Sequence, residues 1–143
     1  MPAPVLSPKG YVLDTSALFC LRDNEEGAAQ VDKIISHAGN SSPVYVCFAS
    51  LMEYFYIVYQ EKGKEDAFRA YLELKMLNLQ IVESDETLRL KAGEIKANFN
   101  LSFADAWIAG TAELCNAFLV HKDPEFEPLG KRIHLKSLPY KKR

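Results

Sequence analysis

The sequence predicts an α/β fold, a three-layer α/β/α sandwich around a central, mostly parallel sheet of four or five strands. Short runs of β-type residues alternate along the chain with longer segments of helical periodicity. Parallel strands need long crossover connections, and segments of this length supply them. The chain has 143 residues, of which 48% are hydrophobic, so it is the size of one domain with a sizeable core.

Runs of β-branched and aromatic residues predict strands at 11–13, 44–47, 79–82 and 117–120, with a weaker fifth at 132–138. Apolar residues at helical spacing predict helices at 16–22, 25–38, 50–62, 64–77, 85–98 and 103–115. This order predicts a single domain over residues 10–138. An irregular arm that contains prolines precedes it at 1–9, and a basic tail follows it at 139–143.

Composition and the N-terminal residues favour a cytoplasmic protein with no membrane attachment. No apolar run reaches the length of a membrane span, and the first residues lack the basic start and apolar core of a signal peptide. Cys20, Cys47 and Cys115 lack the number and spacing of a disulfide framework or a zinc site. We therefore expect all three thiols to be reduced and buried.

The charge distribution is uneven. A net charge of −2 gives no global basic field of the kind that nucleic-acid-binding proteins carry. Six of the 17 basic residues, however, lie within the last 13 positions. These residues form either an ordinary solvated tail or a local contact for phosphate groups.

The segment 50–62 is apolar on nearly every side. Leu51, Phe55 and Val58 form one stripe, and aromatic and aliphatic residues cover much of the remaining surface. A helix of this kind is buried on more than one side. Either another layer of the same chain or the second subunit of a homodimer covers it.

Acidic residues lie where predicted strands end, and parallel α/β sheets bind their ligands at that edge. Asp14 and Asp123 each come shortly after a predicted strand, and Glu53 lies in the first turn of the helix after another. Asp105 lies in the first turn of helix 103–115. It reaches the same edge only if the preceding helix returns the chain there, and spacing alone does not decide this.

Each acid also fits a local structural role. Asp14 can cap a helix, Asp123 precedes a proline in a turn, and Ser50 and Ser102 each stand three residues before an acid, as in a capping box. If the four acids met within ~5 Å, each pair of charges would repel by about 3 kcal/mol at an effective dielectric near 20. Such a cluster takes up protons or holds cations, and an all-oxygen donor set suits Mg²⁺ or Mn²⁺.

Four segments carry a family resemblance: YVLDTSALF, ASLMEYFYIVYQ, LSFADAWIAGTAEL and AFLVHKDPEFEPL. In order and spacing they resemble the acidic motifs of PIN-domain proteins, and most closely those of the VapC-type ribonuclease toxins. The resemblance extends from Gly10 to about Leu138 and implies the PIN-like α/β/α fold.

By position, the resemblance implies catalytic and metal-binding roles for Asp14, Glu53, Asp105 and Asp123. It also implies that Asp105 does reach the shared site. Thr15 matches a hydroxyl residue that orients the first acid. His121 stands where many relatives have Thr or Ser, so it either hydrogen-bonds the acidic cluster or simply ends the strand.

The resemblance implies an endoribonuclease that uses Mg²⁺ or Mn²⁺ and leaves 5′-phosphate and 3′-hydroxyl ends. VapC-type proteins are usually toxins that a small antitoxin protein neutralises, and many are homodimers. Lys122, next to Asp123, is the first candidate for a contact with RNA phosphates. The alternative is a non-catalytic PIN-fold module that binds RNA or serves as a scaffold.

Two phosphoryl-transfer folds fit the sequence poorly. A haloacid-dehalogenase-like phosphatase needs a D-x-D motif where this chain has Asp14, Thr15 and Ser16. A receiver domain needs an acidic pair before its phosphorylated aspartate, whereas Asp23 and Glu25 follow Asp14.

Overall fold

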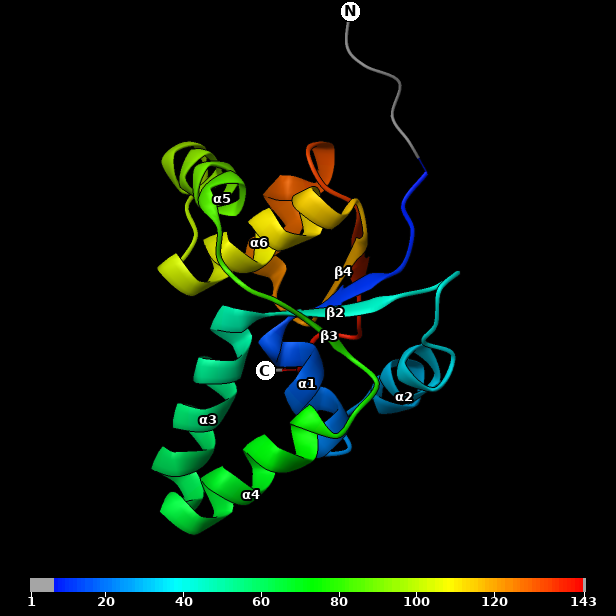
Figure 1. Cartoon of the computed structure of the whole chain (residues 1–143), viewed down its shortest axis with the longest axis vertical. Helices are drawn as coiled ribbons and strands as arrows, with labels where there is room; N and C mark the ends of the chain where they lie inside the picture. The colour runs from blue at the N-terminus through cyan, green and yellow to red at the C-terminus, as the bar shows by residue number, and fades with distance from the viewer. Residues whose placement is uncertain (1–6, 143) are drawn as a thin grey trace, which may run out of the picture.

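The computed structural model describes residues 7–142, and its centre is a five-stranded parallel sheet with the order β3-β2-β1-β4-β5 (Figure 1). The strands are β1 (Tyr11–Leu13), β2 (Val44–Cys47), β3 (Gln80–Val82), β4 (Phe118–His121) and β5 (Leu135–Ser137). All five predicted strands are present, the last one shorter than expected. The predicted arm at 1–9 lies mainly outside the described residues.

Helices cover both faces of the sheet, as the sequence predicted (Figure 1). They are α1 (Thr15–Arg22), α2 (Ala28–Ser36), α3 (Phe48–Lys62), α4 (Lys64–Lys75), α5 (Glu86–Asn98), α6 (Phe103–Cys115) and the 3₁₀ helix η1 (Pro124–Lys131). Alternate residues of β1 face opposite sides: Leu13 packs with α1 to α4, and Val12 packs with α5, α6 and η1. The α/β/α sandwich is thereby confirmed.

The strand order reverses beside β1, and this places the functional edge. The chain passes from β1 outward through β2 to β3, then crosses back to β4 on the other side of β1. The carboxyl ends of β1 and β4 are adjacent, with Leu13 opposite Val120. Residues that follow these two strands therefore emerge together at a topological switch point, where open α/β sheets bind ligands.

Helix α3 is covered mainly by its own chain. Tyr54 and Val58 are buried, and the ring of Phe55 packs edge-on against Phe68 and Tyr71 of α4. The helix begins at Phe48. The expected capping box at Ser50 is therefore wrong, because this residue lies inside the helix and its buried hydroxyl has no hydrogen-bond partner among the described residues.

Helices α5 and α6 pack against each other unusually closely. A Cβ atom added at Gly110 would lie 3.1 Å from three atoms of Ala92, two of them backbone atoms. At the far end, Arg132 ties this pair to the end of η1, because its guanidinium bonds both carboxylate oxygens of Glu113 and pairs with Glu94 at 3.0 Å. This packing holds α6 in place against the sheet.

We predict opposite effects for the same substitution at two glycines of this helix pair. Gly93→Ala, at an exposed position of α5 with open space around it, should raise the free energy of unfolding by about 0.5–1 kcal/mol. Gly110→Ala should lower it by about 1–2 kcal/mol, because the new methyl group forces the two helices apart. Urea denaturation measures both, and equal shifts for the two variants would contradict the close packing.

Candidate metal centre

The four acids that the sequence singled out line one cleft with a volume of about 670 Å³. Asp14 follows β1, Glu53 lies on α3, Asp105 on the first turn of α6, and Asp123 after β4. The return of the chain through α5 brings Asp105 to this edge, which the spacing of the sequence could not decide. The cleft therefore gathers acids from four separate elements.

Asp14 is the most buried of these acids, with 3% of its surface exposed. It caps α1, and its Oδ2 accepts hydrogen bonds from the backbone N–H and the hydroxyl of Ser16. Its Oδ1 is buried and has no hydrogen-bond partner among the described residues. One oxygen of this carboxylate is thus held by the protein, and the other is left without a donor.

Burial dominates the electrostatics of Asp14. It raises the pKa of this carboxyl to about 7, although the hydrogen bond from the hydroxyl of Ser16 lowers the pKa. The negative charges of Asp105 and Glu53 raise the pKa further. A carboxyl with this pKa either keeps its proton near neutral pH or ionises when a cation offsets its charge.

Asp105 shares this environment. Its backbone N–H donates to the hydroxyl of Ser102 at 3.1 Å, so Ser102 caps α6 and supplies one of the two hydrogen bonds of the predicted capping box. Burial raises the pKa of Asp105 to about 6, and the charges of Glu53, Asp123 and Glu125 also raise it. The pKa of Asp105 therefore also depends on acids from α3, from η1 and from the segment after β4.

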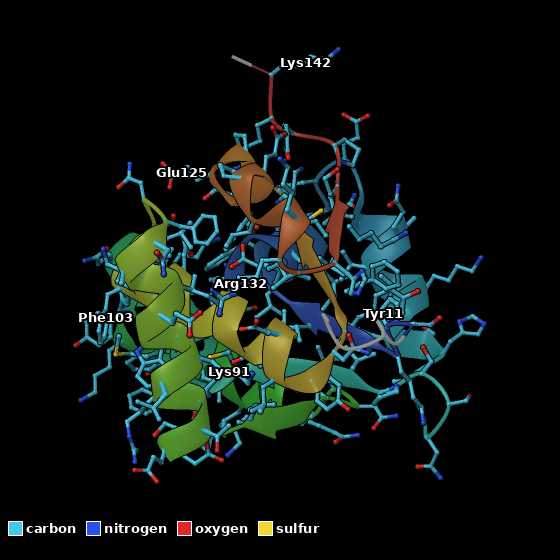
Figure 2. The ribbon with its side chains drawn as sticks, turned by 90° about the horizontal axis from the view of Figure 1, so that it is seen from above. Tyr11, Lys91, Phe103, Glu125, Arg132 and Lys142 are labelled. Carbon is cyan, nitrogen blue, oxygen red and sulfur yellow. The ribbon has the colours of Figure 1, made fainter. Side chains whose placement is uncertain are left out.

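Glu125 is an acid of the site that the sequence did not reveal. Carboxylate oxygens of Asp105, Asp123 and Glu125 all lie within 4.8 Å of one another. Glu125 sits on the first turn of η1 (Figure 2), and its backbone N–H donates to Oδ1 of Asp123 at 2.9 Å. The signal was the pair of acids around Pro124, which indicates a short helix capped by Asp123 as well as a turn.

Ser16 connects Asp14 to the neighbouring strand. Its hydroxyl donates to Asp14 and accepts the backbone N–H of Lys122 at 2.9 Å, directly after β4. Thr15, the residue expected to orient Asp14, has a buried hydroxyl with no partner among the described residues. An orienting role for Thr15 stays a prediction, whereas the hydrogen bonds seen at Asp14 come from Ser16.

His121 is fully buried at the end of β4. Its Nδ1 accepts the backbone N–H of Asp123 at 3.2 Å, and its ring packs against Phe126. Burial lowers the pKa of this imidazole, which favours the neutral ring. Because Nδ1 accepts a hydrogen bond, the proton of a neutral ring lies on Nε2. His121 therefore contacts the backbone of one acid rather than a carboxylate.

Lys122 points away from solvent. Its side chain is 4% exposed, and its Nζ pairs with Glu25 at 3.3 Å and donates to the carbonyl of Glu26 at 3.0 Å. The ammonium group thus joins the end of β4 to the loop between α1 and α2. A contact between Lys122 and RNA stays a prediction.

The donor set fits a hard divalent cation. It contains only carboxylate oxygens, and these acids repel one another when ionised. Carboxylate oxygens of Asp105, Asp123 and Glu125 lie within 4.8 Å of one another, whereas Asp14 and Glu53 line the same cleft outside that group. Mg²⁺, Mn²⁺ and Ca²⁺ prefer such oxygens, whereas zinc and copper sites use histidine and cysteine. The residues present therefore suit the metal that the sequence predicted.

Comparison with known proteins settles the family. A PIN-domain family model matches residues 11–131. The chain belongs to the PIN-domain family. The PIN-like assignment made from the sequence is confirmed, and proteins of this family are typically nucleases. No curated protein matches the chain in sequence.

Solved structures share the fold at low sequence identity. VapBC2 from Rickettsia felis, bound to a promoter DNA fragment, has a TM-score of 0.71 and 18% identity over 90% of this chain and 98% of that chain. VapBC-1 from nontypeable Haemophilus influenzae has a TM-score of 0.71 and 20% identity over 89% and 96%. VapC20 from Mycobacterium tuberculosis, a toxin that cleaves the sarcin–ricin loop, has a TM-score of 0.67 and 15% identity over 85% and 95%.

Two further findings bear on the expectations from composition. Across residues 7–142, no helix is long and apolar enough to cross a membrane. The three cysteines are free thiols, with Cys20 and Cys47 buried and Cys115 half-buried.

We predict that the metal-free protein loses stability as the pH rises. The pKa of Asp14 is about 7 in the folded state, against 3.8 for an aspartate in water, so folding favours the bound proton between these values. The resulting stabilisation is complete below about pH 4 and is lost as the pH rises through about 7, on the order of 4 kcal/mol. Urea denaturation in chelator measures the change.

The Asp14→Asn variant provides the control for this prediction. It should flatten the decline and be more stable than the parent protein above about pH 7, because an amide carries no charge to desolvate. A parent protein whose stability rises over the same interval would show that Asp14 is ionised at low pH.

Proposed function

We propose that this protein is a metal-dependent endoribonuclease and the toxin of a toxin–antitoxin pair. The observation that carries the proposal is the buried, unpaired Oδ1 of Asp14 in a cleft that Glu53, Asp105 and Asp123 also line. A buried carboxylate oxygen that accepts no hydrogen bond is available as a ligand for a cation. Membership of a family of nucleases supports the choice of reaction.

One or two Mg²⁺ or Mn²⁺ ions would be held by Asp14, Glu53, Asp105 and Asp123, and we add Glu125 to this set. Besides burial, the charge of Asp105 raises the pKa of Asp14, and the charges of Glu53 and Asp123 raise the pKa of Asp105. Asp105 is therefore the acid best placed to bind two ions at once. When bound, the ion supplies an activated water molecule and offsets the charge that develops on the phosphodiester.

The chain's own residues fix the acids. Ser16 anchors Oδ2 of Asp14 from two donors and leaves Oδ1 available. The N-terminus of α6 favours the negative charge of Asp105 on its first turn. The neutral ring of His121 accepts the backbone N–H of Asp123 and sets the path of the chain there.

Water is the nucleophile in this scheme. The hydroxyl of Ser16, which lies against an acid of the site, already donates to Asp14 and accepts from the backbone of Lys122. It is therefore committed to structure. Attack by water on phosphorus, with cleavage of the P–O3′ bond and protonation of the departing 3′ oxygen, would leave the 5′-phosphate and 3′-hydroxyl ends that the resemblance to PIN ribonucleases implies.

The same comparisons, with the surface of the protein, support proposals for the partners and the location. Two of the similar structures are VapBC assemblies, which supports an antitoxin partner. Exposed apolar side chains on α3 and α4, among them Tyr56, Phe68 and Leu72, support a homodimer. The free thiols are consistent with the reducing cytoplasm, which also contains RNA.

We predict that RNA cleavage requires a divalent metal and Asp14. With Mg²⁺ or Mn²⁺, the parent protein should cleave members of a panel of single-stranded and structured RNAs, and chelator should abolish cleavage. Asp14→Asn should lower the initial rate by about a hundredfold or more, because it removes a charged ligand. Gel analysis of end-labelled RNA gives the rates and the chemistry of the new ends.

Glu61→Gln is the matched control, since Glu61 is an exposed acid that lines the same cleft outside the cluster. It should retain the parent rate. Cleavage that survives both chelator and Asp14→Asn would refute a metal-dependent reaction at this site. Metal binding without cleavage of any RNA in the panel would instead favour the non-catalytic PIN-fold module.

We predict that Glu125 contributes to metal affinity. Glu125→Gln should weaken Mn²⁺ binding by about tenfold, because it removes one of the three closest carboxylates. Glu127→Gln is the control two residues away, because the carboxylate of Glu127 accepts a hydrogen bond from Tyr140. Isothermal titration with Mn²⁺ compares them, and equal affinities would exclude Glu125 from the centre.

A further inference from the structure

Residues 140–142 run along the acidic cleft. After β5, the backbone N–H of Leu138 donates to the carbonyl of His121 at 2.7 Å, and the side chain of Leu138 is buried in the core. The tail then continues past η1 to Lys142 (Figure 2). Tyr140, Lys141 and Lys142 all line the cleft that holds the acids. A segment distant from the acids in sequence thus forms one wall of their site.

This wall has definite anchors. The hydroxyl of Tyr140 donates to Glu127 at 2.8 Å, and its ring lies 6.1 Å from that of His121. Pro139 and Leu138 pack against Gly27, at the start of α2. Residues 138–140 are therefore bound to η1, β4 and α2, and they present the two following lysines at the rim of the cleft.

The cleft needs cations apart from any metal ion. Among its described lining residues acids outnumber lysines, and the lysines are Lys122, Lys141 and Lys142. An RNA strand carries a negative charge at each nucleotide, and its flanking phosphates would be repelled by the acids of this cleft. Metal ions offset charge only at the reacting phosphate, so the flanking phosphates need side-chain partners.

The three lysines are not equally available. Lys122 is buried and held by Glu25 and the carbonyl of Glu26. Lys141 is 73% exposed and pairs with the other oxygen of Glu25 at 3.0 Å. Lys142 is exposed and has no ion pair with another described residue. The Lys141 end of its pair is exposed, whereas the side chain of Glu25 is 18% exposed. Solvent screens an ion pair with an exposed partner, and Glu25 keeps its pair with Lys122 if Lys141 moves away.

We propose that Lys141 and Lys142 bind the phosphates of single-stranded RNA that flank the scissile bond. This inference rests on the proposed function for the identity of the substrate. Lys142 supplies a free ammonium group, and Lys141 exchanges Glu25 for a phosphate when RNA enters. The tail is the substrate-binding wall of the cleft, and it compensates for the acidity that the metal centre requires.

The salt dependence of RNA binding tests this proposal. The full chain with Asp14→Asn, which prevents cleavage, is titrated with a labelled single-stranded RNA of mixed sequence at several salt concentrations. Each phosphate contact on a single strand adds about 0.7 to the slope of log affinity against log salt. Lys141→Ala and Lys142→Ala should each lower that slope by about 0.7 and weaken binding about fivefold at 0.1 M salt.

Matched variants separate charge from structure. Lys91→Ala, on α5 and far from Lys142 in Figure 2, should leave the slope unchanged. Lys141→Arg and Lys142→Arg should restore it, because arginine keeps the charge. Both lysines are exposed, so the thermal unfolding midpoint of each lysine variant should equal that of the Asp14→Asn chain in which it is made.

Three outcomes would overturn the proposal: an unchanged slope in the double alanine variant, tighter RNA binding by that variant, or no RNA binding by the parent. Cleavage by the wild-type chain is measured separately. Cleavage together with an unchanged slope refutes RNA binding by the tail but retains the proposed ribonuclease activity. A reduced slope without any cleavage retains the role of the tail and refutes the enzyme.

Discussion

The burial of the Asp14 carboxylate is the constraint on which the rest of the site depends. Moving a carboxylate out of water costs several kcal/mol unless partners replace the lost hydration. Ser16 replaces part of it at Oδ2, but Oδ1 is left without a donor among the described residues, and two further acids add repulsion. The fold could avoid this cost with an apolar residue after β1. It keeps a position that is satisfied only by a proton or a cation, and a proton binds less readily as the pH passes about 7. Near neutral pH a divalent cation would therefore restore the balance.

The sheet topology explains why the acids can meet. Leu13 and Val120 are register partners, so the residues after β1 and after β4 emerge side by side, and the hydroxyl of Ser16 joins the two segments. The acids on helices need a second condition. Asp105 reaches the edge because α5 returns the chain to it, and the contact of Gly110 with Ala92 holds that helix pair together. Local capping and a functional role are thus compatible: Asp14 and Asp123 both cap helices, and both line the cleft.

The sequence predicted the elements well because periodicity and β-branched runs are local properties. All five strands and the six α-helices were expected, and strand ends located Asp14 and Asp123. The predictions that were wrong or incomplete concern the exact residue at which a helix begins, which a short sequence pattern does not determine. Ser50 fits a capping box, but α3 begins at Phe48 and places it in the core. The residues around Pro124 fit a turn, although a helix capped by Asp123 brings the carboxylate of Glu125 to those of Asp105 and Asp123. Neither choice is decided by spacing, because both depend on where a helix starts to within a residue.

Lys122 shows why proximity along the chain is a poor guide to charge in this cleft. It adjoins Asp123, yet successive side chains at a strand end point in different directions, and its ammonium group is buried against Glu25. The cations at the rim come from a tail that is adjacent only in three dimensions. A net charge of −2 therefore says little about nucleic-acid binding by this fold. A cleft that must be acidic to hold metal cannot also be basic, so the two requirements are best met by separate segments, with the acids on the rigid sheet edge and the lysines on a wall beside it. In the proposed enzyme, this separation would let the metal affinity and the RNA affinity vary independently, because a substitution in the tail leaves every carboxylate of the cleft in place.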